Sequence, residues 1–232
     1  MLEDALATVL RVPAVPLTVA GRTDAGVHAT GQVASADVAA LPDRRRLAGV
    51  LPPDVRVTDV RAVPAEFDAR FSALWRRYEY RIADDAAAAD PLRRRFVLAW
   101  PRPLAVDAMA EAAATLLGLH DFAAFCRRRE GATTVRAIER FTVARDGQGE
   151  IVATVVADAF CHSMVRSLAG ALLAVGEGRR GAEWPAALLA RDRRADDVPV
   201  APPHGLTLVE VGYPPDAELA ARAALTRARR TL

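Results

Sequence analysis

The sequence predicts an α+β protein made of two subdomains, each mixing sheet and helices, with a cleft between them. Three patterns support this prediction. Residues 2–10 place apolar side chains at the spacing of one helix face. Residues 77–82 alternate apolar and charged side chains, as a half-buried strand does. Residues 84–103, rich in alanine, arginine and proline, interrupt these patterns and indicate a join between two halves.

The first subdomain is expected to span residues 1–83 and to combine short strands with helices. Its clearest strand comes last, where Tyr78, Tyr80 and Ile82 face one way and charged residues face the other. The other predicted elements are, in order, a helix at 1–10, a short buried strand at 16–20, a strand at 31–37, a short helix at 41–51 and a strand at 54–63.

The second subdomain is expected at residues 104–215, after the join at 84–103. A "GQG" turn between two apolar stretches is typical of a β-hairpin. Residues 216–232 are predicted to form a basic helical tail. The predicted elements are, in order, a helix at 106–117, a strand pair at 135–146 and 150–157, a long helix at 162–176, a shorter helix at 183–192 and a closing strand at 205–213.

The basic residues are all arginine: 31 of them stand against 29 acids, for a net charge of +2. Guanidinium groups suit phosphate and base contacts, and clustered arginines favour a basic surface for nucleic acid. The alternatives are a GC-rich coding sequence and ordinary solvated faces. The clusters are Arg44–Arg46, Arg76–Arg77, Arg93–Arg95, Arg127–Arg129, Arg179–Arg180 and Arg193–Arg194.

No pattern in the chain predicts a membrane-bound or secreted protein. The sequence lacks a run of about eighteen apolar residues, and its N-terminus carries Glu3 and Asp4 instead of the basic start of a signal peptide. Cys126 and Cys161 have no CxxC spacing and are predicted to be reduced core thiols. We therefore expect a cytoplasmic protein with no membrane partner.

A lone carboxylate lies in the stretch "GRTDAGVHATGQ", residues 21–32. Asp24 is surrounded there by residues that favour a tight turn, with Arg22 just before it. If backbone N–H groups and a nearby cation keep it ionised, such a carboxylate can act as a nucleophile toward an electrophilic carbon. The alternative is that Asp24 only caps its own turn, as aspartates in glycine-rich loops commonly do.

Two further features are candidates for the same chemistry. On the predicted long helix, His162, Arg166 and Gly170 recur every four residues, so the arginine either reaches toward a cleft or forms a surface salt bridge. Tyr78 is either a core aromatic or a platform on which a base stacks. The histidines lack metal-ligand spacing, and no metal site is expected.

Six ordered segments of this chain resemble those of the tRNA pseudouridine synthase A family. The loop segment "AGRTDAGVHATGQV" looks like the active-site motif of that family. The other five follow in the family's order, so the resemblance extends over nearly the whole chain, to about Tyr213. They are "LPPDVRV", "FDARFSALWRRYEYRI", "GLHDFAAF", "AFCHSMVRSLAGALLAVGEG" and "HGLTLVEVGY".

The resemblance implies the pseudouridine synthase fold and an isomerase that acts on uridines 38, 39 and 40 of the tRNA anticodon stem-loop, with no metal and no organic cofactor. Asp24 matches the family's aspartate nucleophile, which either attacks the ribose C1′ or extracts the C2′ proton. Arg166 matches the arginine that pairs with that carboxylate. Tyr78 matches the tyrosine that stacks on the target base and is suited to the final proton removal.

Two more residues receive roles from the resemblance. Arg22 matches an arginine thought to help expel the target nucleotide from its stack, and Leu206 would supply an apolar floor below the ring. Because these residues come from both halves of the chain, the active site is expected in the cleft. The resemblance also implies a homodimer with tRNA lying across both chains, gripped by the arginine clusters.

The N-terminus departs from the family pattern. Family members begin with a strand of roughly thirty more residues, whose loss would leave an open sheet edge. We hypothesise that the true start codon lies upstream.

Two alternatives to an active synthase stay open: a truncated, catalytically weak tRNA-binding remnant, and an aspartate-dependent hydrolase with a metal. The hydrolase requires a second acid near Asp24, which the sequence does not offer.

Overall fold

The computed structural model describes residues 1–85, 89–127 and 133–227. The chain divides into a smaller unit, with residues 1–21, 33–73 and 213–227, and a larger unit, with residues 22–32 and 74–212. Each unit contains both helices and strands, which confirms the α+β class. Parts of the predicted join, of the arginine cluster at Arg127–Arg129 and of the basic tail lie outside the described residues.

The larger unit is built on a seven-stranded sheet with the order β2-β9-β4-β8-β7-β6, and β5 also pairs with β4. The pairs β2–β9 and β4–β5 are parallel, and the others are antiparallel. The strands are β2 (His28–Ala29), β4 (Trp75–Ala83), β5 (Leu98–Ala99), β6 (Gly118–Asp121), β7 (Val135–Arg145), β8 (Ile151–Ala157) and β9 (Leu206–Gly212).

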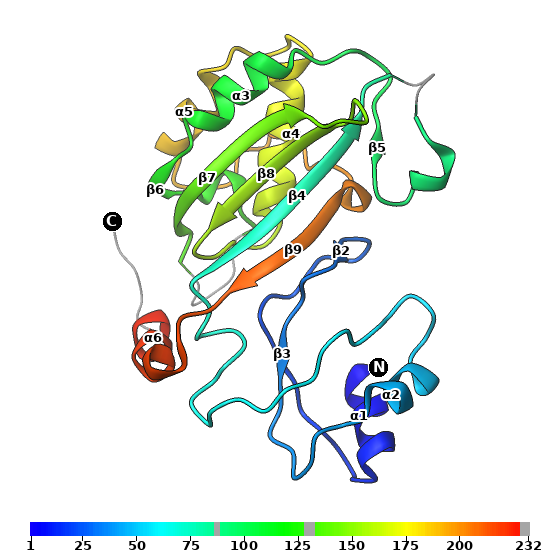
Figure 1. The fold of residues 1–232 in the computed structure, drawn as a ribbon. Helices are drawn as coiled ribbons and strands as arrows, with labels where there is room; N and C mark the ends of the chain where they lie inside the picture. The colour runs from blue at the N-terminus through cyan, green and yellow to red at the C-terminus, as the bar shows by residue number, and fades with distance from the viewer. Residues whose placement is uncertain (86–88, 128–132, 228–232) are drawn as a thin grey trace. The chain divides into compact units, whose positions relative to one another are not determined.

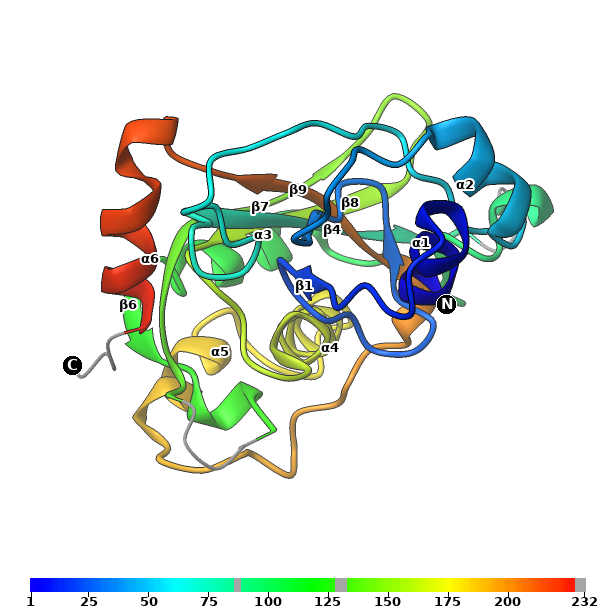
Figure 2. The ribbon, with the colours of Figure 1, turned by 90° about the horizontal axis from the view of Figure 1, so that it is seen from below.

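Helices α3 (Val106–Ala114), α4 (Met164–Gly176) and α5 (Trp184–Ala187) cover one face of this sheet (Figures 1 and 2). Every residue of α4 except Arg166 is buried, because the helix packs between the sheet and its neighbours. Burial of its leucine and valine side chains is the main stabilising contribution of this layer. Four 3-10 turns complete the unit: η1 (Pro91–Arg93), η2 (Ala123–Phe125), η3 (Leu188–Ala190) and η4 (Pro203–Gly205).

Strand β4 confirms the predicted alternation. Tyr78, Tyr80 and Ile82 are buried in the core cluster that includes α3 and α4, whereas the charged residues between them are only partly buried. This follows from the period of two along a strand. The hairpin of β7 and β8, the helices at α3, α4 and α5, and the closing strand β9 are likewise where the sequence predicts them.

The smaller unit has its own core. Ala5, Leu6 and Val9 of the first helix pack with Leu47 and Leu51. Asp43 caps the second helix by accepting hydrogen bonds from two backbone N–H groups of its first turn. The elements of this unit are α1 (Leu2–Leu10), β1 (Thr18–Val19), β3 (Ala34–Ser35), α2 (Arg44–Val50), the 3-10 turn η5 (Asp216–Glu218) and α6 (Leu219–Arg227).

The predicted strand at 54–63 is wrong, because these residues form no ladder with any described strand. Val55 and Val57 instead pack against the core of the smaller unit. Their alternation with polar neighbours therefore reflects burial of an irregular segment. Three strands of the larger unit were not predicted at all: β2, which pairs with β9, β5 of the join, which pairs with β4, and β6, which pairs with β7.

The prediction of two reduced core thiols is also wrong for this structure. Cys126 and Cys161 form a disulfide, with their Cα atoms 5.7 Å apart. Their separation of 35 residues along the chain hides this proximity, because the pair becomes close only when the η2 segment packs against the segment before α4. No helix among the described residues is long and apolar enough to cross a membrane.

An ion pair fixes the end of β4 in the larger unit. The carboxylate of Asp84, with only 5% of its side chain exposed, accepts hydrogen bonds from both terminal nitrogens of Arg145, at 2.8 and 2.7 Å. It also accepts the backbone N–H of Leu104 at 2.8 Å. The Arg145 hydrogen bond is the main reason that the pKa of Asp84 lies below its ordinary value of 3.8.

We predict that Asp84→Asn lowers the free energy of unfolding by about 2 kcal/mol at pH 7, because it removes the charge of a buried carboxylate that is hydrogen-bonded to Arg145. Since the folded-state pKa of Asp84 is depressed, its contribution is fully present above the ordinary pKa of 3.8 and is lost progressively as the pH falls below that value and through the lower folded-state pKa. Urea unfolding at pH 7 and pH 3 tests this. The exposed Asp196→Asn is the control, and an equal loss at both pH values would contradict the prediction.

Candidate active site

Asp24 begins a tight turn in the loop that precedes β2. The carbonyl of Asp24 accepts the N–H of Val27 at 3.0 Å, and Gly26 has a φ of 81° at the third position. A turn with positive φ at that position favours glycine, which explains the sequence pattern. After β2, the N–H groups of Thr30 and Gly31 both donate to the carbonyl of Leu208 in β9, which fixes the far end of the loop.

The side chain of Asp24 does not cap its own turn. One carboxylate oxygen accepts a hydrogen bond from Arg166 Nη1 at 3.0 Å and one from the Ser163 hydroxyl at 3.3 Å. The other lies 3.2 Å from Nε2 of His162. The exposed fraction of the Asp24 side chain is 24%, so the carboxylate is screened from most of the solvent yet still reachable.

Arg166 is held in place from a second side. Its Nε donates to the carbonyl of Ala201 at 2.8 Å, and its own carbonyl accepts the N–H of Ala201 at 3.0 Å. The segment that contains Ala201 approaches α4 closely because Gly170 has no side chain: a Cβ there would collide with the carbonyl oxygen of Pro199. The predicted stripe of His162, Arg166 and Gly170 therefore has a physical reason, and Arg166 does not form a surface salt bridge.

Tyr78 lies on β4, and its ring makes a T-shaped contact with Phe160, at 5.1 Å between ring centroids. Burial raises the pKa of Tyr78 to about 12. The charge of Arg76 opposes this shift, and the negative charge of Asp24 adds to it. The influence of Asp24 shows that the carboxylate and the phenol belong to one electrostatic environment. The phenol is consequently protonated at neutral pH.

The structure places the other two predicted site residues in the same unit. Leu206, buried at the start of β9, lies opposite Tyr80 in the register of β4. Arg22 is exposed two residues before Asp24, and among the described residues its guanidinium has no hydrogen-bond or ion-pair partner. Asp24, Tyr78, Arg166 and Leu206 thus all belong to the larger unit, because the loop at residues 22–32 joins that unit.

Sequence reasoning missed two neighbours of Asp24. His162 was recognised only as part of a helix stripe, and Ser163 was not recognised at all. Both lie just before α4, three or four residues from Arg166, which is the spacing that brings side chains to one side of a helix. Their position relative to Arg166 is the one signal in the sequence that could have identified them.

The predicted arginine cluster at Arg76–Arg77 serves the fold instead of forming a basic surface. Arg76 is buried and donates to the carbonyl of Asp158. Arg77 pairs with Glu210 at 2.7 Å. Both arginines belong to β4, which has a strand on each side, so their side chains are drawn into contacts with neighbouring elements.

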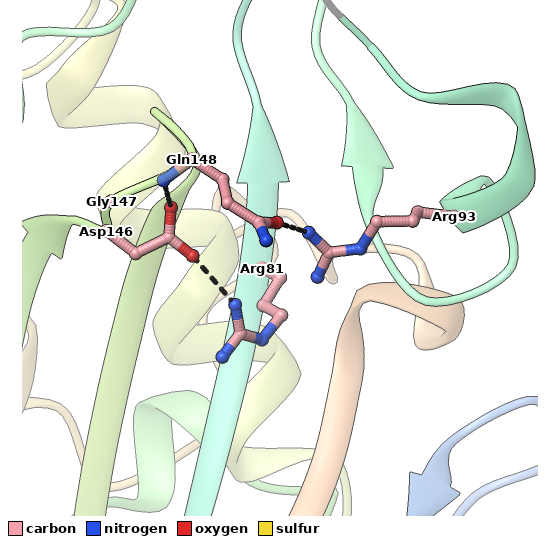
Figure 3. A pocket seen from close by; sticks show the side chains of 5 residues that line it. All are labelled: Arg81, Arg93, Asp146, Gly147 and Gln148. Atoms are coloured by element: carbon pink, nitrogen blue, oxygen red, sulfur yellow. Dashed lines mark hydrogen bonds and ion pairs between the residues drawn. The ribbon is translucent and has the colours of Figure 1, made fainter.

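A polar pocket at the β7–β8 turn is lined by Arg81, Arg93, Asp146, Gly147 and Gln148 (Figure 3). Its charges are already paired: Arg81 contacts Asp146 at 3.0 Å, and Arg93 contacts Glu150 at 2.6 Å. Figure 3 shows Gln148 pointing to Arg93 across the same opening. The contacts that line this pocket therefore join η1 to the β7–β8 hairpin, and neither guanidinium is free to bind a phosphate.

The comparisons with known proteins agree on one family. The family model described as tRNA pseudouridine synthase matches residues 112–214. The chain is 64% identical to tRNA pseudouridine synthase A of Frankia casuarinae over 98% of this chain and 85% of the relative. It is 57% identical to the protein of that name from Streptomyces griseus, over 100% of this chain and 84% of the relative. With such identity over nearly its whole length, the chain belongs to the tRNA pseudouridine synthase A family.

Proposed function

We propose that this protein converts uridine to pseudouridine at positions 38 to 40 of the tRNA anticodon stem-loop, with Asp24 as the nucleophile and no cofactor. The observation that carries the proposal is the ion pair between the partly buried Asp24 and Arg166, at 3.0 Å. The names of the relatives supply the substrate class and the type of reaction.

The isomerisation needs only a nucleophile or base and a place for the detached base to rotate. The bond from the ribose C1′ to the uracil N1 breaks, a bond from C1′ to C5 forms, and the C5 proton is transferred to N1. Asp24 either attacks C1′ directly or removes the C2′ proton to release the base. Substrate and product contain the same atoms and electrons, so the overall reaction requires no oxidant, reductant or co-substrate.

Arg166 has two roles in this proposal. Its guanidinium donates a charge-assisted hydrogen bond to the Asp24 carboxylate at 3.0 Å and so holds the proposed nucleophile in place. Its contact with the carbonyl of Ala201 fixes the direction from which the guanidinium approaches the carboxylate. Because Ala201 already holds Arg166, the charge-assisted hydrogen bond between Arg166 and Asp24 needs little further loss of conformational entropy when the substrate binds.

Tyr78 and Leu206 are proposed to hold the target base. The Tyr78 ring supplies a stacking surface, and its protonated hydroxyl supplies a hydrogen-bonding group that takes part in the final proton transfer. Leu206 supplies apolar surface beside it. Arg22, exposed and unpaired among the described residues, is proposed to occupy the space that the base leaves when it is expelled from its stack.

The homodimer and the cytoplasmic compartment implied by the family resemblance belong to the same proposal. Exposed arginines that form no ion pair among the described residues, such as Arg45 and Arg46 of α2, are proposed to contact the tRNA backbone. Such contacts weaken steeply as salt concentration rises.

We predict that Asp24→Asn abolishes turnover, with a loss of at least about 10³-fold, because the amide cannot act as a nucleophile. The measurement is pseudouridine mapping on unmodified tRNA transcripts with uridine at positions 38 to 40, together with a tRNA binding assay. Asp54→Asn, an exposed change of the same kind, is the control. Binding without turnover by the unaltered chain would instead identify a tRNA-binding remnant.

We predict that Arg22→Ala slows conversion of a base-paired target uridine by about 10-fold and changes conversion of a mismatched one much less. The mismatched base is already partly unstacked, so less help is needed to expel it. Single-turnover rates on two transcripts that differ only in the pairing of uridine 39 provide the test. Arg61→Ala removes an equally exposed guanidinium as the control, and an equal slowing on both transcripts would contradict the role.

We predict that Tyr78→Phe retains tRNA binding within about twofold and lowers the single-turnover rate by about 10²-fold, because the ring remains and the proton-transferring hydroxyl is lost. With a pKa of about 12, the phenol stays protonated from pH 7 to 9, so the loss should be constant over that range. Rates measured at several pH values test this prediction. A loss that grows with pH would point to a phenolate instead.

A further inference from the structure

Ser163 has an unusual backbone conformation. Its φ of 63° and ψ of 6° lie in the left-handed region, which disfavours residues with a Cβ. Among the described residues, Arg11, at the C-terminal end of α1, is the one other non-glycine residue with positive φ. At helix C-termini this conformation is common. At the N-cap it is not, because an N-cap residue normally has extended backbone angles.

The hydroxyl of Ser163 is also used in an unusual way. A serine at the N-cap normally accepts a hydrogen bond from an N–H group of the first helical turn. In α4 the Ser163 side chain makes no such bond. It donates instead to the carboxylate of Asp24, at 3.3 Å. The helix therefore lacks a side-chain cap, and the serine contacts the proposed nucleophile.

The neighbouring residues also hold this turn in place. The carbonyl of His162 accepts the N–H of Arg127 at 3.0 Å, and the carbonyl of Cys161 accepts the N–H of Met164 at 3.0 Å. Cys161 is itself bonded to Cys126. With the backbone fixed in this way, the ring of His162 lies 3.2 Å from the second oxygen of Asp24. Each carboxylate oxygen thus has at least one partner from the start of α4.

We propose that Ser163 and His162 are positioning residues for Asp24, and that the strained conformation of Ser163 is retained because it directs both side chains to that carboxylate. The inference rests on the proposed role of Asp24 as the nucleophile. Arg166 supplies the charge, whereas Ser163 and His162 fix the rotation of the carboxylate, so that one oxygen is aimed at the reacting carbon. A preorganised group of this kind acts on the rate of the chemical step and not on tRNA affinity.

The test separates activity from stability. Ser163→Gly removes the hydroxyl and also relieves the backbone strain, so we expect the single-turnover rate to fall about 10-fold while the melting temperature rises. Ser163→Ala should lose the same rate without gaining stability. Arg11→Gly is the matched control, because it relieves the same kind of strain in the smaller unit: its melting temperature should rise and its rate should stay unchanged. tRNA affinity should stay within about twofold throughout.

Two results would overturn the inference. The first is a wild-type rate in Ser163→Gly. The second is a rate loss in Ser163→Gly that accompanies a lower melting temperature, as a purely structural role predicts. His162 is tested in parallel: His162→Leu should slow the reaction, and His162→Gln, which keeps a donor, should recover part of the loss.

A readout that does not need turnover distinguishes this inference from the proposed function. If Ser163 holds Asp24, the unfolding free energies of Ser163→Ala, Asp24→Ala and the double variant are non-additive. Additive values would overturn the positioning role. If the unfolding free energies are non-additive but the wild-type protein forms no pseudouridine, the proposed function is overturned and the contact between Ser163 and Asp24 is still supported.

Discussion

The contact between Asp24 and Arg166 is the interaction on which the rest of the site depends. It joins residues 142 positions apart and places a carboxylate, with about a quarter of its side chain exposed, against a guanidinium. Partly buried charges of this kind are stable only with partners in good geometry. The turn at Gly26, the contact of Arg166 with Ala201 and the close approach permitted by Gly170 all serve to provide that geometry.

The sheet of the larger unit positions the Asp24 loop for this contact. β4 is central, and its buried face presents Tyr78 opposite Leu208 of β9. β9 also pairs in parallel with β2, and Leu208 accepts the hydrogen bonds that end the Asp24 loop. A two-residue strand is thus enough to place the loop, because the long strand beside it is fixed by the core. Functional loops are commonly positioned by rigid neighbours in this way.

The sequence predicted the elements whose side chains repeat with a clear period, such as β4, α4 and the β7–β8 hairpin. It could not predict pairings that depend on distant partners: β2 beside β9, or the disulfide of Cys126 and Cys161. Residues 54–63 were wrongly predicted to form a strand. Alternation of apolar and polar residues indicates that every second side chain is buried, and this does not require hydrogen bonds to a neighbouring strand. Asp24 and Arg166 stood out from the loop composition and the helix spacing and received their roles from the family resemblance. Ser163 was missed because the direction of its side chain depends on a backbone angle that the sequence does not reveal.

The arginines of this chain show why charge alone is a weak guide to RNA contact. Arg77, Arg81, Arg93 and Arg145 are all paired with carboxylates of neighbouring strands or turns, and these pairs connect elements of the larger unit. A guanidinium engaged in this way has little left to offer a phosphate. In the same unit, Arg22 is exposed beside the proposed nucleophile and has no such partner among the described residues. Contact with the substrate therefore depends on which cations the fold leaves unpaired, and the net charge of +2 does not measure that.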